Sequence, residues 1–297
     1  MRKNKVYSIA WARAVAGRIP TKEELASYLS LQNERELLER VTRKLGIKQQ
    51  YDSLDMELKN YIGTITVNMS LVSDMAVPQL RSLHLHNLRY TLEKKLAGYS
   101  VFEKEHLYAF NGVPLLEAQI KRIFESESIE RARTGEPWID ELFIRMRRIA
   151  GEQPDSGLLS LFIERERVIF INKFKQLGSM ARFEVDAYNS KLALIIGDSR
   201  PELSDSLFIS EKPKVKGESE VISALQKKYG LQVESIDLDS FIESARHELT
   251  VKNMIRFDES NVYTVLQMLL GFEKNVSIIN QSIKQKIGKE LALKIIG

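Results

Sequence analysis

The sequence FEVDAYNSKLALIIG occupies residues 183–197 and contains the pattern that decides the fold. Its apolar residues recur every three or four positions, which predicts a helix with one face against a core. Glu184, Asp186 and Asn189 lie among them, and such polar groups are costly to bury unless each finds a partner. We therefore expect this helix to pack against other helices and to hydrogen-bond with them. The apolar members of the pattern are Val185, Tyr188, Leu192 and Ile195.

The composition fits a globular protein with a substantial core. The chain has 297 residues, 43% hydrophobic and 28% charged, which is enough for one large domain or a few smaller ones. A net charge of +4 spread along the chain is weak evidence for nucleic-acid binding, which usually concentrates Lys and Arg. There is no cysteine, which excludes disulfides, thiol catalysis and thiolate metal sites. No stretch approaches the roughly 18 to 20 apolar residues that span a bilayer, so we expect a soluble chain.

Helical periodicity with recognisable ends extends over most of the chain. Thr21 is placed to cap a helix whose third residue, Glu24, completes a capping box. A helix over 33–45 should end at Gly46. The polar residues 198–217 are the best candidate for an exposed connector. Further helices are predicted over 6–17, 51–77, 79–98, 115–133, 138–149, 158–177, 181–196, 218–229, 238–252 and within 259–295.

Internal repetition organises these helices. Residues 36–46 read ELLERVTRKLG and residues 220–230 read EVISALQKKYG, with the same length and the same apolar positions. Residues 127–135 form a shorter relative. Modules that share one helical pattern can stack and bury a continuous core. We therefore predict an all-α fold of three similar helical modules that close around an axis. The predicted modules are residues 1–100, 101–200 and 201–297.

Several segments, taken in order, resemble the C subunit of V/A-type rotary ATPases, which is called the d subunit in eukaryotes. Residues 7–25 are similar to its opening tyrosine, Ala-Arg-rich helix and acidic capped helix. Residues 85–92 resemble the helix that ends its first module, and residues 183–186 are the closest local match. Residues 270–276 resemble its last helix, although the family has a more acidic segment there.

The resemblance implies a pseudo-threefold funnel that sits on the membrane rotor ring, receives the central shaft and carries torque without doing chemistry. The implied partners are the c/K-type proteolipid ring and the D/F-type shaft subunits, with no nucleic acid, cofactor or metal. The implied place is cytoplasmic and peripheral, on the membrane sector of a proton- or sodium-transporting complex. The candidates for module contacts or for the socket lining are Arg13, Arg18, Glu184, Asp186 and Asn189.

No catalytic constellation stands out in the sequence. His84 and His86 would share a metal on a strand, but on the predicted helix they point in different directions. Glu184 and Asp186 could form a catalytic pair, although neighbouring acids more often pair with Arg or Lys. The basic run 145–148 is more often a solvated helix face than a phosphate site. The main alternative is a helical-repeat scaffold that binds another protein or nucleic acid.

Overall fold

The fold is all-α, as predicted, and the described part of the chain contains no strand. The computed structural model describes residues 5–99, 106–108, 121–123, 125–126, 133–150, 156–196, 207–233, 235, 237–256, 258–287 and 289–295. Most of the helix predicted over 115–133 lies outside these residues. The helices are α1 (Lys5–Ala16), α2 (Lys22–Tyr28), α3 (Glu34–Leu45), α4 (Leu54–Val72), α5 (Val77–Leu96), α7 (Pro137–Ala150), α8 (Ser156–Asn172), α9 (Ser179–Ile196), α11 (Glu218–Tyr229), α12 (Leu238–Met254), α13 (Ser260–Gln285) and α14 (Lys289–Ile295).

Local chemistry sets the helix ends that the sequence predicted. The N–H of Glu24 donates to Thr21 Oγ1 at 3.3 Å, and the N–H of Thr21 donates back to Glu24 Oε2 at 2.8 Å. This capping box satisfies two of the donors that a helix start leaves open. Helix α3 ends at Gly46, whose φ of 68° lies in the left-handed region that favours glycine. Both predicted ends are therefore confirmed.

Packing divides the chain into two compact units. The first comprises Met1–Leu80, Glu103–Asn111 and Thr250–Gly297, and the second comprises Arg81–Phe102 and Gly112–Leu249. Two of the boundaries fall inside helices, at Leu80–Arg81 in α5 and at Leu249–Thr250 in α12. The division into three modules and the funnel both stay predictions.

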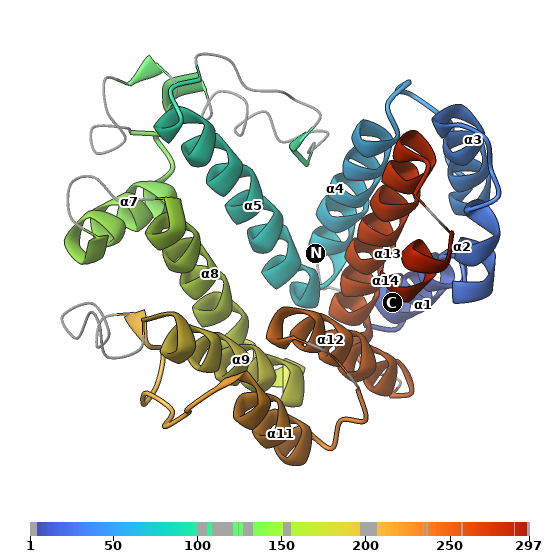
Figure 1. The fold of residues 1–297 in the computed structure, drawn as a ribbon. Helices are drawn as coiled ribbons and strands as arrows, with labels where there is room; N and C mark the ends of the chain where they lie inside the picture. The colour runs from blue at the N-terminus through green and yellow to red at the C-terminus, as the bar shows by residue number, and fades with distance from the viewer. Residues whose placement is uncertain are drawn as a thin grey trace. The chain divides into compact units, whose positions relative to one another are not determined.

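Helix α13 is the centre of the first unit. It packs against α1, α4, α3, α2 and α14, and lies alongside α4 in Figure 1. Its core face is fully buried at Val262, Leu266 and Leu269, one turn apart. This helical spacing places one continuous stripe of α13 in the core of the unit.

The second unit is built on α8, which packs against α7 and α9, while α9 also packs against α11. Leucines of α5 join α7 and α8 in one buried cluster that includes Phe143 and Phe162. Arg81 of α5 stacks beside it, with its guanidinium carbon 3.4 Å from the centre of the Trp138 ring. A second cluster gathers around α9 and includes Leu192 and Leu207.

The predicted connector over 198–217 is partly wrong. Of this range the structure describes 207–217, and its first residues are not exposed. Leu207 has no exposed surface and Phe208 is 8% exposed, because both side chains pack against α9. The remaining part, 198–206, lies outside the described residues.

The repeat that relates residues 36–46 to residues 220–230 extends further in the structure than the sequence pattern indicated. Helices α3 and α11 have the same length, and each ends at a left-handed glycine, Gly46 and Gly230. The same separation in sequence relates the first residues of the helices that follow, Leu54 of α4 and Leu238 of α12, which are both buried. The order and spacing of α3 and α4 therefore recur in α11 and α12.

Candidate functional site

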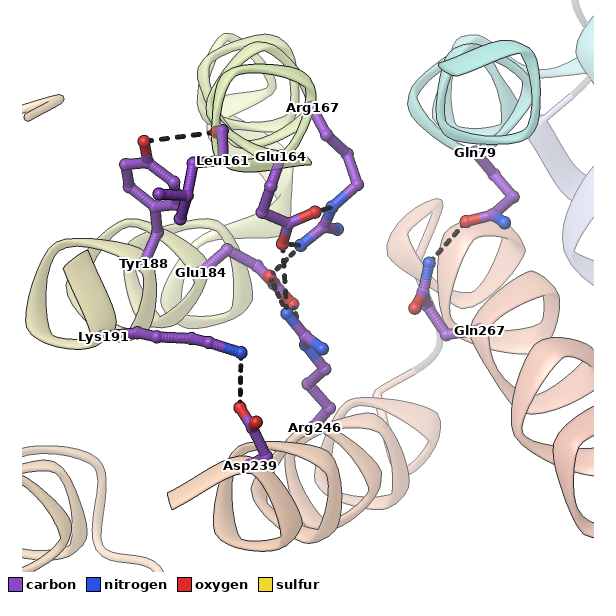
Figure 2. Close-up of polar contacts among 10 residues, drawn as sticks. All are labelled: Gln79, Leu161, Glu164, Arg167, Glu184, Tyr188, Lys191, Asp239, Arg246 and Gln267. Carbon is purple, nitrogen blue, oxygen red and sulfur yellow. Dashed lines mark hydrogen bonds and ion pairs between the residues drawn. The ribbon is translucent and has the colours of Figure 1, made fainter. Parts of the chain in front are cut away.

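Glu184 lies at the centre of an ion-pair cluster that joins three helices of the second unit. Its side chain, on α9, is 8% exposed. Arg246 of α12 donates two hydrogen bonds to it, from Nε to Oε1 at 2.7 Å and from Nη2 to Oε2 at 2.8 Å. Arg167 of α8 adds a third, from Nη2 to Oε2 at 2.5 Å. Figure 2 shows both guanidinium groups converging on this carboxylate from different helices.

A second carboxylate balances the two arginines. Glu164 of α8 accepts from Arg167 at 2.8 and 2.6 Å, and its Oε1 lies 3.6 Å from Nη2 of Arg246 (Figure 2). The cluster is thus two acids and two bases with no net charge. Glu184 and Arg167 are 8% and 16% exposed, whereas Glu164 and Arg246 keep 39% and 34% of their side-chain surface exposed. Removal of a partner of Glu184 would leave a buried charge unpaired.

The electrostatics keep both acids ionised. Burial alone would raise the pKa of Glu184, but Arg167 and Arg246 outweigh it and lower that pKa to about 2. Burial opposes ionisation at Glu164 too, and the same two arginines lower its pKa. Glu184 is therefore charged at neutral pH, with both oxygens occupied. It ties α8, α9 and α12 together and is poorly suited to exchange protons.

An open cleft of about 800 Å³ lies beside this cluster, between α8, α9 and α12. Lys191 of α9 and Asp239 of α12 form a 2.6 Å ion pair there (Figure 2). Tyr188 donates a hydrogen bond to the carbonyl of Leu161, at 3.4 Å, within the lining. The apolar lining includes Leu158, Leu161, Tyr188, Ile195 and Ile242. The charged lining is Arg89, Glu164, Lys191, Asp239, Glu243 and Arg246.

The other two predicted polar residues of α9 contact different neighbours. Asp186 accepts a short hydrogen bond from the hydroxyl of Tyr229 and lies 2.6 Å from Nζ of Lys228, both at the end of α11. Asn189 donates to Ser210 Oγ at 2.6 Å and accepts from the N–H of Ile209 at 3.0 Å. Glu184 thus binds α8 and α12, Asp186 binds α11, and Asn189 binds residues 209–210. Each of the three has the partner that the sequence required.

The predicted arginines of the first unit both lie at helix C-termini. Arg13 Nη2 donates to the carbonyl of Met254 at 3.0 Å, where α12 ends. Arg18 Nη1 lies 3.5 Å from the carbonyl of Leu45, at the end of α3. Cations at these positions satisfy open carbonyls and complement the helix dipole. Arg13 and Arg18 belong to the first unit and the α9 residues to the second.

A comparable carboxylate lies in the first unit. Phe272 and Glu273 of α13 repeat the Phe–Glu pair of α9, and both are buried. Glu273 Oε1 lies 3.1 Å from Nζ of Lys59 of α4, and its Oε2 accepts from the hydroxyl of Tyr108 at 2.6 Å. Burial and the neighbouring Glu273 raise the pKa of Tyr108. The two units thus each bury an ion-paired glutamate that follows a phenylalanine.

Sequence reasoning missed the basic partners of these glutamates. The repeat contains a signal for one of them. Leu54 corresponds to Leu238, and by the same separation Ile62, a fully buried residue of α4, corresponds to Arg246 of α12. An arginine at a position that is core in the other copy indicates a buried partner of opposite charge. Arg167 and Lys59 have no such signal in the sequence.

The residues considered for metal or phosphate binding are engaged in packing or in ion pairs. His84 and His86 lie on α5, so the predicted helix there is confirmed. His84 packs edge-on to Trp138 at 6.1 Å, and burial together with Arg81 lowers its pKa to about 4. Arg145 of the basic run pairs with Glu166 at 2.7 Å. Within the described ranges, no three or more His, Asp or Glu side chains gather as metal ligands would.

Comparisons with known proteins leave the chain without an assigned relative. No model of a known protein family matches the sequence, and no curated protein matches it. Among the helices described, none is both long enough and apolar enough to cross a membrane. The fold and the site define the chain as an all-α protein with a repeated order of helices and an ion-paired, buried glutamate in each unit.

Proposed function

We propose that this chain is a non-catalytic adapter in the central stalk of a V/A-type rotary ATPase. It couples the rotor shaft to the proteolipid ring during proton or sodium transport. The proposal places it at the cytoplasmic surface, bound to the membrane sector through the ring. This is the function implied by the resemblance of its ordered sequence segments to the C subunit of that family.

The observation that carries the proposal is that the order and spacing of α3 and α4 recur in α11 and α12, with a left-handed glycine at the end of the first helix in each copy. An adapter of this kind is built from similar helical modules that offer broad contact surfaces. The cluster around Glu184 supports the same function, because a torque-bearing body needs helices that do not slide. Sliding of α8 past α9 would separate Arg167 from Glu184, and both side chains are largely shielded from water.

The test is an affinity pull-down of the tagged chain from gently solubilised native membranes, with partners identified by mass spectrometry. A tagged nucleotide-binding subunit, purified in parallel, shows that the rotary complex survives the detergent. Recovery of the ring proteolipid together with shaft subunits is the expected result. Recovery of neither, while the parallel preparation is intact, would overturn the proposal. A helical scaffold would then be the leading function, tested by nucleic-acid binding across salt concentrations.

A further inference from the structure

The guanidinium group of Arg81, on α5, lies over two aromatic rings of the second unit. Its central carbon is 3.4 Å from the centre of the Trp138 ring and 4.9 Å from the centre of the Phe170 ring. At the shorter distance the planar group stacks on the ring, so its N–H bonds, which lie in its own plane, stay available to an acceptor. The rings therefore hold the side chain in place without satisfying its donors.

No described residue accepts from these donors. The guanidinium of Arg81 has neither a hydrogen bond nor an ion pair within the described ranges. Glu166 of α8 is close enough to raise its pKa, but both carboxylate oxygens are engaged elsewhere. Oε1 accepts from Arg165 at 3.2 Å, and Oε2 accepts from Arg145 at 2.7 Å. Since Arg81 is half-buried, its open donors are costly, and a bound anion would remove that cost.

Further basic groups lie near Arg81. On α7, Arg145 follows Trp138 by seven residues, so the two side chains lie on the same face of the helix. The side chain of Arg145 is 41% exposed, and of its nitrogens only Nη2 donates a hydrogen bond to a described residue. Nζ of Lys173, which follows α8, is 5.6 Å from the centre of the Phe170 ring, and this exposed side chain has no ion pair among the residues described.

The charges favour a phosphate over a carboxylate as the ligand. Burial and the nearby Arg145 lower the pKa of Arg81 to about 10, so its guanidinium is still charged at neutral pH. Arg81 and Lys173 thus add two positive charges to a group of paired ions that is neutral in itself. A phosphate monoester carries about −1.5 to −2, whereas a carboxylate carries a single charge. The paired ions are Arg145, Arg165, Glu141 and Glu166.

We propose that Arg81 binds a phosphate group through its open N–H donors. The fork of the guanidinium donates two parallel hydrogen bonds to two phosphate oxygens, while Trp138 and Phe170 fix its orientation. Arg145 donates to a further oxygen, which a tetrahedral group presents in another direction, and Lys173 adds positive charge. Soluble phosphate esters and phosphomonoester headgroups of lipids both present this group. The proposal does not depend on the adapter function.

The first experiment is equilibrium dialysis of the purified full-length chain against radiolabelled inorganic phosphate at constant ionic strength. We expect saturable binding with a Kd on the order of 1 mM or tighter. Arg81→Lys keeps the charge but loses the fork and the stacking, and should weaken binding by about tenfold or more. Arg35→Lys, at a position 87% exposed on α3, is the control and should bind as the parent does. Absence of saturable binding, or equal binding by Arg81→Lys and the parent, would overturn the proposal.

A second variant keeps the test valid if Arg81→Lys unfolds. Lys173→Gln lies on the surface, so it should retain the thermal midpoint of the parent while phosphate binding weakens about threefold. The emission of Trp138, isolated by Trp11→Phe because the chain has two tryptophans, should change in parallel with phosphate occupancy. Saturable binding that leaves this emission unchanged and is insensitive to Lys173→Gln would place the anion elsewhere and contradict the proposal.

Competition assigns the class and the source of the ligand. Acetate that displaces phosphate as well as phosphate itself does would overturn the phosphate proposal and indicate an acidic side chain of a partner. Displacement by glycerol 3-phosphate, without binding to vesicles, would support a soluble ester. Co-sedimentation with phosphatidylcholine vesicles only when they contain phosphatidic acid, and its loss in Arg81→Lys, would support a lipid headgroup. If neither glycerol 3-phosphate nor these vesicles bind at Arg81, the proposal fails.

Discussion

Glu184 determines much of the polar packing of the second unit. Its carboxylate binds Arg167 and Arg246 and so links α9 to two other helices. The cluster is neutral only while all four of its ions are present. At the scale of the residue, substitutions that remove one of these charges should therefore strongly lower the free energy of unfolding.

Glu184→Gln should be strongly destabilising. The amide keeps the shape but leaves two guanidinium groups facing one carboxylate, and breaking a buried pair in this way costs about 3 to 5 kcal/mol. Urea denaturation measures the loss. Glu243→Gln, an exposed carboxylate on α12, is the control and should change the free energy of unfolding by less than about 1 kcal/mol. Equal effects of the two substitutions would contradict a structural role for the cluster.

Glu184 should also make stability depend on pH in a defined direction. Its pKa falls from the ordinary 4.5 to about 2 in the folded chain, so its contribution is fully present well above pH 4.5. That contribution is lost as the pH falls through about 2. A shift of this size corresponds to about 3 kcal/mol. The difference in unfolding free energy between the parent and Glu184→Gln should therefore shrink between pH 6 and pH 2. A constant difference would exclude the shift.

Reversal of charge at Asp186 should lower the folded yield. Asp186→Lys removes the acceptor of the Tyr229 hydroxyl and places a second ammonium beside Lys228. Glu211→Lys is the control, because Glu211 is exposed and has no ion pair in the described part of the chain. The measurement is the soluble, cooperatively unfolding fraction of each variant. Normal folding of Asp186→Lys with impaired shaft binding would instead assign Asp186 to the lining of the predicted socket.

At the scale of the element, local signals predicted more than long-range ones. The capping box at Thr21, the end of α3 at Gly46 and the length of α9 follow from neighbouring residues, and all were predictable. The burial of Leu207 was not, because a short apolar pair in a polar segment has no period that reveals its contact with α9. The need of Glu184 for partners was predictable, but the choice of Arg167 depends on how α8 packs.

The glycines of these elements should respond to alanine with opposite signs. Gly46 and Gly230 have φ of 68° and 61°, so alanine at either should cost about 1 kcal/mol. Gly271 lies inside α13, where an added methyl group meets nothing within 4 Å, so Gly271→Ala should stabilise by up to about 1 kcal/mol. Chemical denaturation of the three variants measures this. Destabilisation by Gly271→Ala would show that the exposed face of α13 is occupied by another contact.

At the scale of the whole molecule, each compact unit has its own buried Phe–Glu pair. In the first unit, Glu273 binds Lys59 and Tyr108, and in the second unit Glu184 binds two arginines. Each carboxylate draws its partners from its own unit. Both Phe–Glu pairs can be read in the sequence, but their placement in different units could not be predicted from it, because the first unit joins segments from both ends of the chain.

Hydrogen exchange should therefore localise the effect of each glutamate. We expect Glu184→Gln to lower amide protection in α8 and α9, and Glu273→Gln to lower it in α4 and α13, because protection reports local as well as global opening. Mass spectrometry of proteolytic fragments resolves the two regions. Equal loss of protection throughout both units in either variant would indicate that the chain opens only as a whole.

The division of the chain also orders events on the ribosome. Helices α1 to α4 are synthesised early, yet they pack against α13, which is synthesised only after the entire second unit. At translation rates of about 5 to 20 residues per second, the nascent first unit waits on the order of ten seconds or more with its apolar faces uncovered. All residues of the second unit are synthesised before α13, so this unit can fold before the first. We therefore expect chaperones that bind nascent chains to bind helices α1 to α4 during this interval.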